Sequence, residues 1–357
     1  MFWTRRSWVA CWRLCPTRRF GGSTPATTYR VKLRKSSSRC SESSSRTADS
    51  IQDRGRAMTS ARRRYAQMKS LLEVPILNEK FWSKVPTVSA DAIMLDLEDS
   101  TTPSNKELAR DRIVEALGAP EYFGGRHVIV RVNNLSTPWG RDDLSALAAA
   151  DGDFLISYPK VETAEEIGEV RSVMESSGEL RGLHVMIETA RAVLELDRIA
   201  SQDGVAGLHF GYVDYAADVG SRPFNDEGDD LYAPSTHYVR AKIAIAAAAY
   251  GLFCTGGTLI PEYQDHEKVQ RFVRSWVDLG YTACIAVSPK HLPIINETLT
   301  PSVEQQARAR EICDAYEESV RKGDPAAVLA GRVITLPDYR VASLVLVRAG
   351  HDLVASV

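Results

Sequence analysis

The chain has 357 residues, of which 44% are hydrophobic and 25% are charged, and its formal net charge is -2. This charge gives no electrostatic reason to expect a nucleic-acid partner, and no apolar run approaches the roughly 18 residues that cross a membrane. The length suits one large α/β domain or two smaller ones. We therefore expect a globular protein with a sizeable core and with neither a nucleic-acid nor a membrane partner.

Residues 1–57 differ from the rest of the chain. They are rich in Arg and Ser, have no acidic residue before Glu42, and show no sustained period of 2 or 3.6. We expect a disordered leader outside the fold. It resembles a mitochondrial transit peptide, which would place the protein in the matrix. We favour the alternative, upstream sequence with Met58 as the true start, which implies a cytoplasmic protein.

From residue 69 onward, short apolar runs alternate with amphipathic stretches. Eight runs are expected to be strands: 69–75, 91–99, 127–133, 154–160, 183–189, 207–214, 252–257 and 283–289. Helical patterns lie between them, over 104–117, 163–174, 191–199, 238–249 and 267–279. Eight strand–helix units predict a TIM (β/α)8 barrel over residues 58–300, followed by a C-terminal helical lid over 301–357.

Several of these runs end abruptly in polar residues. The polar endings are Asp96-Leu97-Glu98-Asp99, Arg131-Val132-Asn133, Pro159-Lys160, Glu188-Thr189 and Asp214. The carboxyl ends of the strands form the active-site face of a TIM barrel. This topology therefore gathers several carboxylates, an Arg, an Asn and a Lys in one mouth.

Glu188 and Asp214 end consecutive predicted strands. Two neighbouring carboxylates with room for water suit a hard cation that prefers oxygen ligands. The alternative is a pair of buried acids neutralised by Lys or Arg, which would need as many bases as acids, and the acids are in excess here. We expect the pair to bind Mg²⁺, with Mn²⁺ as an alternative ion.

Glu98 and Asp99 add two carboxylates at the end of the second run. They are placed to hold metal-bound waters around the cation. Their alternative role is to cap the following helix, which the residues of Ser100-Thr101-Thr102 serve equally well. We therefore expect Glu98 or Asp99 to be functional.

Arg131 carries a planar guanidinium suited to bidentate capture of a substrate carboxylate. The alternative is an ion pair with Glu98 or Asp99; we favour the substrate role because Arg is costly to bury for structure alone. Lys160 is a Schiff-base nucleophile, a charge stabiliser or a structural partner, and the sequence does not separate these roles. The nearby carboxylates favour its protonated form, which is a weak nucleophile.

Histidine and cysteine spacing gives no indication of zinc. His209 lies within a predicted strand and is expected to be a satisfied core histidine. The run Cys254-Thr255-Gly256-Gly257 is expected to be a tight turn after the seventh strand, with a phosphate-binding turn as the alternative.

A set of short motifs occurs in a characteristic order. They are Ser70-Leu71-Leu72-Glu73-Val74-Pro75, Leu95-Asp96-Leu97-Glu98-Asp99-Ser100, Arg131-Val132-Asn133, Pro159-Lys160-Val161-Glu162, Ile187-Glu188-Thr189-Ala190 and Gly211-Tyr212-Val213-Asp214. Over about residues 69–350 the chain resembles the HpcH/HpaI aldolase and citrate lyase β-subunit family, especially its CitE-like malyl-CoA and citramalyl-CoA lyases. The resemblance matches Glu188 and Asp214 to the Mg²⁺ ligands, Glu98 and Asp99 to the surrounding acids, and Arg131 to the clamp on the keto-acid carboxylate.

Three segments depart from the family pattern. Ile76-Leu77-Asn78 replaces a Gly-Asp-Arg-Pro loop of the CoA-using members, and Ser288-Pro289 replaces a His-Pro. Thr335 stands where the family's lid carries a catalytic Asp that acts across subunits, and the nearest carboxylate in that segment is Asp338. A hydroxyl cannot act as a carboxylate acid or base near neutral pH, so the CoA-thioester chemistry is the part in question.

We expect a Mg²⁺-dependent carbon–carbon lyase, of aldol or Claisen type, for a hydroxy- or 2-oxo-carboxylic acid that is free or a CoA thioester. The expected catalytic residues are Arg131, Glu98, Asp99 and Lys160, with Arg131 and Glu188 also binding substrate. The alternatives are a malyl-CoA-type thioester hydrolase and a protein that binds metal and keto acid without turnover. The resemblance implies a homotrimer.

Overall fold

The structure is a computed structural model that describes residue 65, residues 67–225 and residues 234–351. The predicted leader at 1–57 and the predicted start at Met58 lie outside these residues. Within the described part, no helix combines the length and the apolar character that a membrane crossing requires. Cys254, Cys284 and Cys313 are buried free thiols.

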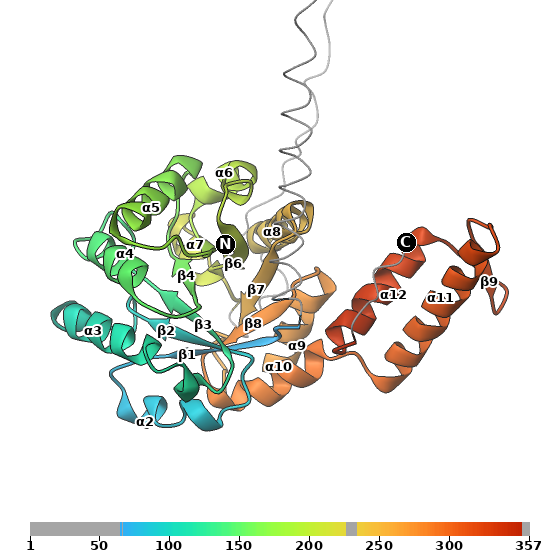
Figure 1. The fold of residues 1–357 in the computed structure, drawn as a ribbon, viewed down its shortest axis with the longest axis horizontal. Coiled ribbons are helices and arrows are strands. Elements are labelled where there is room, and N and C mark those ends of the chain that lie inside the picture. Colours follow the sequence, from blue (N-terminus) through green and yellow to red (C-terminus); the bar gives the residue numbers. More distant parts are fainter. Residues whose placement is uncertain (1–64, 66, 226–233, 352–357) are drawn as a thin grey trace, which may run out of the picture. The chain divides into compact units, whose positions relative to one another are not determined.

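Eight parallel strands follow one another around a closed barrel (Figure 1). They are β1 (Ser70–Val74), β2 (Ala92–Asp96), β3 (His127–Arg131), β4 (Leu155–Tyr158), β5 (Leu183–Ile187), β6 (Val205–Phe210), β7 (Phe253–Gly257) and β8 (Ala283–Ala286). The barrel closes where β8 pairs with β1. Each of the eight predicted runs overlaps one strand, so the predicted TIM barrel is confirmed.

Helices connect the strands and cover the barrel. They are α2 (Glu79–Trp82), α3 (Lys106–Leu117), α4 (Gly140–Ala149), α5 (Ala164–Ser177), α6 (Ala190–Ala200), α7 (Tyr212–Asp218), α8 (Pro234–Tyr250), α9 (His266–Asp278) and α10 (Leu292–Leu299), with short 3-10 turns η1 (Val85–Thr87), η2 (Pro103–Asn105), η3 (Pro120–Phe123) and η4 (Pro289–His291). Thr163 and Thr189 cap the N-termini of α5 and α6, and their side chains accept hydrogen bonds from the backbone N–H groups of Glu166 and Ala192. These caps satisfy N–H groups that would otherwise lack partners.

Strand side chains alternate between the barrel interior and the layer beneath the helices. On β1, Leu71 belongs to the interior cluster, whereas Leu72 and Val74 belong to the larger cluster that includes helical residues. Glu73 follows Leu71 by two positions and therefore also faces inward. At the carboxyl end of a strand, such a residue projects into the barrel mouth.

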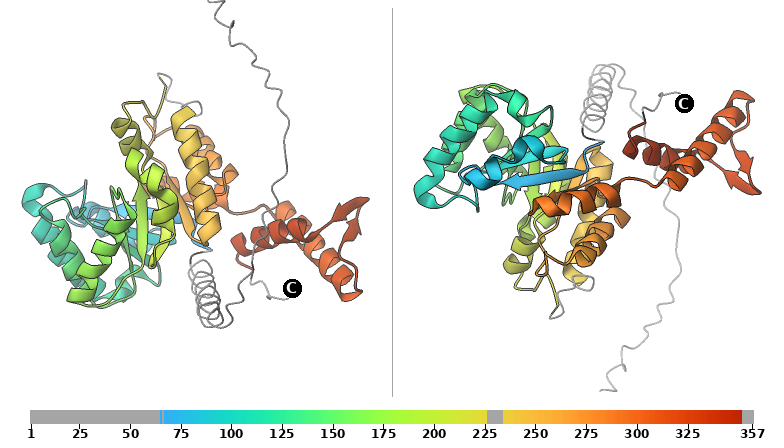
Figure 2. Two further views of the ribbon diagram at one scale, coloured as in Figure 1. Left: turned by 90° about the horizontal axis from the view of Figure 1, so that it is seen from above. Right: turned by 90° about the horizontal axis from the view of Figure 1, so that it is seen from below.

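Two helices follow the barrel. The α11 (Val303–Arg321) and α12 (Leu336–Arg348) helices lie side by side (Figure 2), and the strands β9 (Ala327–Leu329) and β10 (Arg332–Ile334) between them pair antiparallel. A cluster holds the two helices together: Ala309, Cys313, Ala342 and Leu346. The C-terminal segment is thus helical, and its action as a lid stays a prediction.

Two expectations about strand ends are wrong. Asp214 does not end a strand: β6 stops at Phe210, and Asp214 lies in the first turn of α7. Residues 254–257 form neither a tight turn nor a phosphate-binding turn, because they are the buried end of β7. Their small size has a packing reason, since a Cβ on Gly256 would lie 2.4 Å from the ring of Trp276.

Candidate active site at the carboxyl end of the barrel

Asp96 and Arg131 are partners in register on the neighbouring strands β2 and β3, so their side chains project to the same face. Arg131 donates from Nε to Oδ1 of Asp96 at 2.6 Å and from Nη2 to Oδ2 at 2.8 Å. Burial alone would raise the pKa of Asp96, but the Arg131 guanidinium holds that pKa below its usual value. Both groups are therefore charged at neutral pH.

The guanidinium of Arg131 has two further carboxylate neighbours. Its Nη2 donates to Oε1 of Glu73 at 3.0 Å, and its Nη1 lies 3.5 Å from Oε2 of Glu98. The ion-pair alternative is therefore present, with Asp96 rather than Glu98 or Asp99 as the main partner. Among the described residues, Nη1 has only the long contact with Glu98, so this edge remains open to a ligand. Substrate binding by Arg131 stays a prediction.

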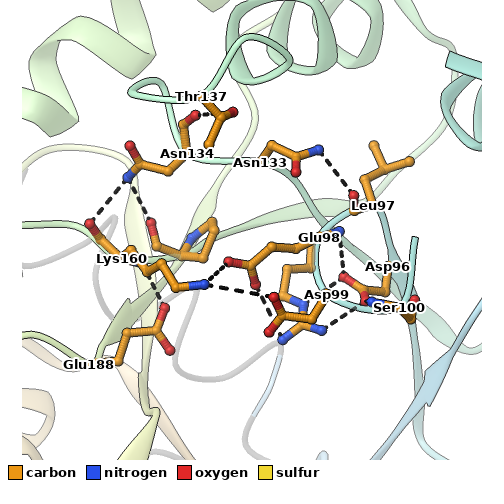
Figure 3. A network of polar contacts seen from close by, with 12 residues as sticks. Asp96, Leu97, Glu98, Asp99, Ser100, Asn133, Asn134, Thr137, Lys160 and Glu188 are labelled. Carbon is orange, nitrogen blue, oxygen red and sulfur yellow. Dashed lines mark hydrogen bonds and ion pairs between the residues drawn. The ribbon is translucent and has the colours of Figure 1, made fainter. Parts of the chain in front are cut away.

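Lys160 links the loop after β2 to the end of β5 (Figure 3). Its Nζ pairs with Oε1 of Glu98 and lies 3.8 Å from Oδ1 of Asp99. Its φ of 51° lies in the left-handed region, which costs a non-glycine residue about 1–2 kcal/mol. In this conformation its backbone N–H donates to Oε1 of Glu188 at 2.7 Å. The strained backbone conformation of Lys160 is thus the one in which its N–H group binds the carboxylate of Glu188.

For both Lys160 and Glu98, burial and the oppositely charged neighbours shift the pKa in opposite directions. Burial alone would lower the pKa of Lys160, but the hydrogen bond to Glu98 and the charges of Glu98 and Asp99 raise that pKa above its usual value. Burial raises the pKa of Glu98, and Arg131 and Lys160 offset the rise only in part. An amine held protonated is a poor Schiff-base nucleophile, so the geometry fits a charge stabiliser or a structural partner.

Two asparagines after β3 hold these loops in place. Oδ1 of Asn133 accepts from Nζ of Lys106 at 2.8 Å, and the same amine donates to the carbonyl of Glu98 at 2.7 Å. Asn134 donates to the carbonyl of Lys160 at 3.1 Å. Asn133 was expected in the mouth, but it is buried and does not line the cavity at this end of the barrel. It instead supports the loop that carries Glu98.

Glu188 is a buried carboxyl group at the end of β5. Its burial, together with the carboxylates of Glu98 and Asp214, raises its pKa to about 8. Its side chain lies against Gly211, where a Cβ would stand 2.1 Å from Oε2 of Glu188. Asp214 is exposed in the first turn of α7. A cation would relieve the repulsion between the two carboxylates.

A cavity of about 280 Å³ opens at this end of the barrel. Among the predicted site residues, Asp99, Arg131, Glu188 and Asp214 line it, whereas Glu98 and Lys160 contact lining residues instead. Within the described ranges, no three His, Cys, Asp or Glu side chains form a ready metal cluster. Mg²⁺ retains several waters and needs only one or two carboxylates, so Glu188 and Asp214 fit it.

His209 borders the same cavity and ends a chain of buried polar groups. Its Nδ1 lies 2.9 Å from Oγ1 of Thr255, which lies 2.8 Å from Nε2 of His184. Nδ1 of His184 in turn lies 3.2 Å from Oγ of Ser157. Burial lowers the pKa of both histidines, that of His184 to about 3, so both rings are neutral near pH 7. His209 is thus a hydrogen-bonded core histidine that also faces the cavity.

Comparison with known proteins decides the family. Residues 69–289 match the HpcH/HpaI aldolase/citrate lyase family. The chain belongs to this family. A (3S)-malyl-CoA thioesterase of Cereibacter sphaeroides is 31% identical over 269 residues, which are 74% of this chain and 89% of that protein. An L-malyl-CoA/beta-methylmalyl-CoA lyase of the same species is 29% identical over 289 residues, 75% of this chain and 90% of that protein.

Solved structures of the citrate lyase family share the fold. CitE from Mycobacterium tuberculosis, in complex with magnesium, acetoacetate and coenzyme A, is 26% identical with a TM-score of 0.66, and the match covers 80% of this chain and 99% of that one. The citrate lyase beta subunit of the same organism, with oxaloacetate and magnesium, is 25% identical with a TM-score of 0.57, covering 66% and 99%. The resemblance indicated by the motifs is confirmed.

Thr335 precedes α12, at the position where the resemblance implied an Asp. The backbone N–H and Oγ1 of Thr335 both donate to Oδ2 of Asp338, at 3.0 and 2.8 Å, and Arg332 donates to its Oδ1 at 2.8 Å. The hydrogen bonds from Thr335 hold the pKa of Asp338 below its usual value. Asp338 is therefore engaged in capping a helix, and its geometry gives no support for a role as the missing lid acid.

The sequence places Asp96 in the mouth without giving it a role, and it does not single out Glu73, although both carboxylates face inward. Glu73 follows the interior residue Leu71 by two positions, and Asp96 follows the interior residue Met94 in the same way. Extending the period-2 alternation to the end of β1 identifies Glu73 as well. Nothing in the sequence shows that Gly211 is small because Glu188 packs on it.

Proposed function

We propose that this protein is a Mg²⁺-dependent carbon–carbon lyase for a hydroxy- or 2-oxo-carboxylic acid, with the second fragment carried as a CoA thioester. The observation that carries the proposal is that one cavity brings together an arginine with an open edge, Arg131, and two repelling carboxylates, Glu188 and Asp214. The M. tuberculosis CitE solved with magnesium, a small acid and coenzyme A supports it. So does the malyl-CoA lyase of C. sphaeroides.

Glu188 and Asp214 are the residues that would hold the cation. When bound, Mg²⁺ supplies Lewis-acid polarisation of an oxygen of the substrate. The chain positions Glu188 for this role through the backbone N–H of Lys160 and through Gly211, whose missing side chain leaves the room that Glu188 occupies.

Arg131 binds the carboxylate of the acid through its Nη1 edge. Asp96 fixes the guanidinium by its bidentate pair, so the orientation of that edge is set before the ligand arrives. In the cleavage direction the substrate hydroxyl gives its proton to water, the carbon–carbon bond breaks, and the electron pair of that bond becomes an enolate on the other fragment. The ammonium of Lys160, held in place by Glu98, adds positive charge that favours such an anion.

A thioester hydrolase of the malyl-CoA type is the second candidate, favoured by the 31% identical thioesterase. The two activities give different products from malyl-CoA. A lyase releases glyoxylate and acetyl-CoA, whereas a hydrolase releases malate and the free thiol of CoA. Mass spectrometry of the products of the full-length chain with Mg²⁺ and malyl-CoA separates them. Binding of oxaloacetate with Mg²⁺ but no product from any thioester would instead indicate a non-catalytic binding protein.

The metal assignment is tested by Glu188→Gln and Asp214→Asn, which keep size and remove charge. We expect each variant to lose Mg²⁺ binding in calorimetric titration and to lose at least about 100-fold in turnover, because the cation supplies several kcal/mol of charge stabilisation. Glu162→Gln, at an exposed carboxylate in the loop after β4, is the control. Wild-type Mg²⁺ affinity in both site variants would remove these residues from the metal site.

We also propose a cytoplasmic homo-oligomer, with residues 1–57 outside the folded unit. Family resemblance supports a trimer. Apolar side chains exposed on the C-terminal helices support association of copies.

A further inference from the structure

Glu73 is an acid of the mouth that the proposed function leaves without a role. It is the last inward-facing residue of β1 and lines the same cavity as Arg131 and Glu188. Its side chain is 24% exposed, so it is sheltered yet open to the cavity. An inward acid at the top of a barrel strand stands where TIM-barrel enzymes place catalytic groups.

Only one oxygen of Glu73 is engaged. Oε1 accepts from Nη2 of Arg131 at 3.0 Å, and within the part of the chain that the structure describes Oε2 has no hydrogen-bond partner. The neighbouring carboxylates are more fully committed. Asp96 accepts two bonds from Arg131 and two from backbone N–H groups, and Glu98 is paired with Lys160.

Asp99 also lines the cavity but differs from Glu73 in exposure. Its side chain is 63% exposed, and its Oδ1 lies 3.8 Å from Nζ of Lys160. Glu73 is the more sheltered of the two.

We propose that Glu73 is the general acid of this site, which hands a proton to the enolate carbon after the carbon–carbon bond has broken. The inference rests on the proposed lyase function. As the bond breaks, its electron pair becomes the enolate. The O–H bond of Glu73 then breaks, a C–H bond forms on the enolate carbon, and the resulting carboxylate regains a proton from water. In the reverse direction the carboxylate removes that same proton from the thioester fragment.

The surroundings of Glu73 suit a proton carrier. Burial raises its pKa, Arg131 lowers it in part, and the carboxylates of Asp96, Asp99 and Glu98 raise it again, so the pKa lies above the usual value. A carboxyl group with a raised pKa stays protonated at higher pH than an ordinary one. An acid catalyst is most effective when its pKa lies near the working pH.

The rival interpretation is that Glu73 only adds a second partner to Arg131. Glu73→Gln separates the two, because the amide oxygen still accepts from Arg131 while no proton can be transferred. We expect the variant to bind Mg²⁺ and oxaloacetate within about twofold of wild type in calorimetry. Its kcat for malyl-CoA should fall by roughly 10²–10⁴-fold, the usual loss for a general acid or base. Glu73→Asp, which keeps the carboxyl, should recover part of that loss.

Proton transfer itself is followed by deuterium exchange. Wild type incubated with Mg²⁺, glyoxylate and acetyl-CoA in D₂O should place deuterium in the acetyl group, and Glu73→Gln should not. Thermal melts of both variants confirm folding. If wild type cleaves malyl-CoA and Glu73→Gln keeps its kcat and its exchange, this inference fails while the lyase assignment stands. If wild type neither cleaves a thioester nor incorporates deuterium, the proposed lyase function fails, and the role proposed for Glu73 fails with it.

Discussion

A carboxylate buried without a cation raises the free energy of the folded protein. Glu188 is 3% exposed, and it faces the charges of Glu98 and Asp214 with a backbone N–H as its hydrogen-bond donor. Metal affinity and instability of the metal-free protein therefore have one origin in this residue. Removing the charge of Glu188 should therefore abolish metal binding and stabilise the metal-free protein.

We predict that Glu188→Gln stabilises the metal-free protein at high pH. The pKa of Glu188 is about 8 in the folded chain against 4.5 for the unperturbed group, so its contribution to stability is present below pH 4.5 and is lost as pH rises through 8. A pKa difference of one between the folded and unfolded chain corresponds to about 1.4 kcal/mol, so the variant should be more stable than wild type by roughly 2–5 kcal/mol at pH 9. Urea unfolding with EDTA at pH 5 and pH 9 measures this.

Adding Mg²⁺ should reverse the order of the two proteins, because an ion that binds only the folded wild type stabilises it by mass action. If the free energy of unfolding of wild type and of Glu188→Gln has the same pH dependence in EDTA, ionising Glu188 in the folded protein costs little free energy. That result would contradict the effect expected from its burial.

At the scale of elements, the sequence predicted the eight strands because runs rich in Val and Ile stand out from the amphipathic helices between them. It predicted less well where each strand ends. The change from β6 to α7 at Gly211 depends on packing against Glu188, which belongs to the end of β5. A contact between distant segments leaves no local pattern, so Asp214 was placed on a strand instead of a helix.

The site was predicted in the same uneven way. Arg131, Glu188 and Asp214 were found because they follow apolar runs and match family motifs, and all three line the cavity. Asp96 was placed in the mouth, but its pairing with Arg131 was not predicted, because that pairing comes from the register between β2 and β3. Register is a property of two strands, and a single strand's sequence does not show it.

Strands β4 to β7 contribute the buried chain Ser157, His184, Thr255 and His209, which carries a pH dependence. Burial lowers the pKa of His184 to about 3, whereas an unfolded histidine titrates near pH 6.5. Stability is therefore full above about pH 6.5 and falls as pH drops toward 3, because the unfolded chain takes up the proton first. His184→Gln should lose about 1–2 kcal/mol at pH 7 and show a shallower decline between pH 6.5 and 4, measured by urea unfolding.

Ser157→Ala is the matched control, because it removes a hydrogen bond from the same chain without removing a titratable group. It should lower stability by a similar amount at every pH and keep the slope of wild type. An unchanged acid slope in His184→Gln would mean that His184 is protonated in the folded protein, against its burial.

At the scale of the whole molecule, the α11 and α12 helices bury one face against each other and leave another face apolar and open. Val341 and Leu344, three residues apart on α12, are 65% and 47% exposed. Residues at this spacing share a helix face. Adjacent exposed apolar side chains on a helix that follows a complete barrel indicate a surface for another copy of the chain.

We predict that the protein forms a homo-oligomer, a trimer by family resemblance, and that Val341→Glu combined with Leu344→Glu breaks it into smaller species. Burying an unpaired charge at an interface costs about 3 kcal/mol, which corresponds to a dissociation constant raised by roughly 100-fold. Light scattering coupled to size-exclusion chromatography measures the mass over a dilution series. Leu194→Glu, at a residue that is 78% exposed on α6, adds one of the same charges outside this face and should leave the mass unchanged. A wild-type chain that is monomeric at every concentration would contradict the prediction, and the active site would then have to be complete within one barrel.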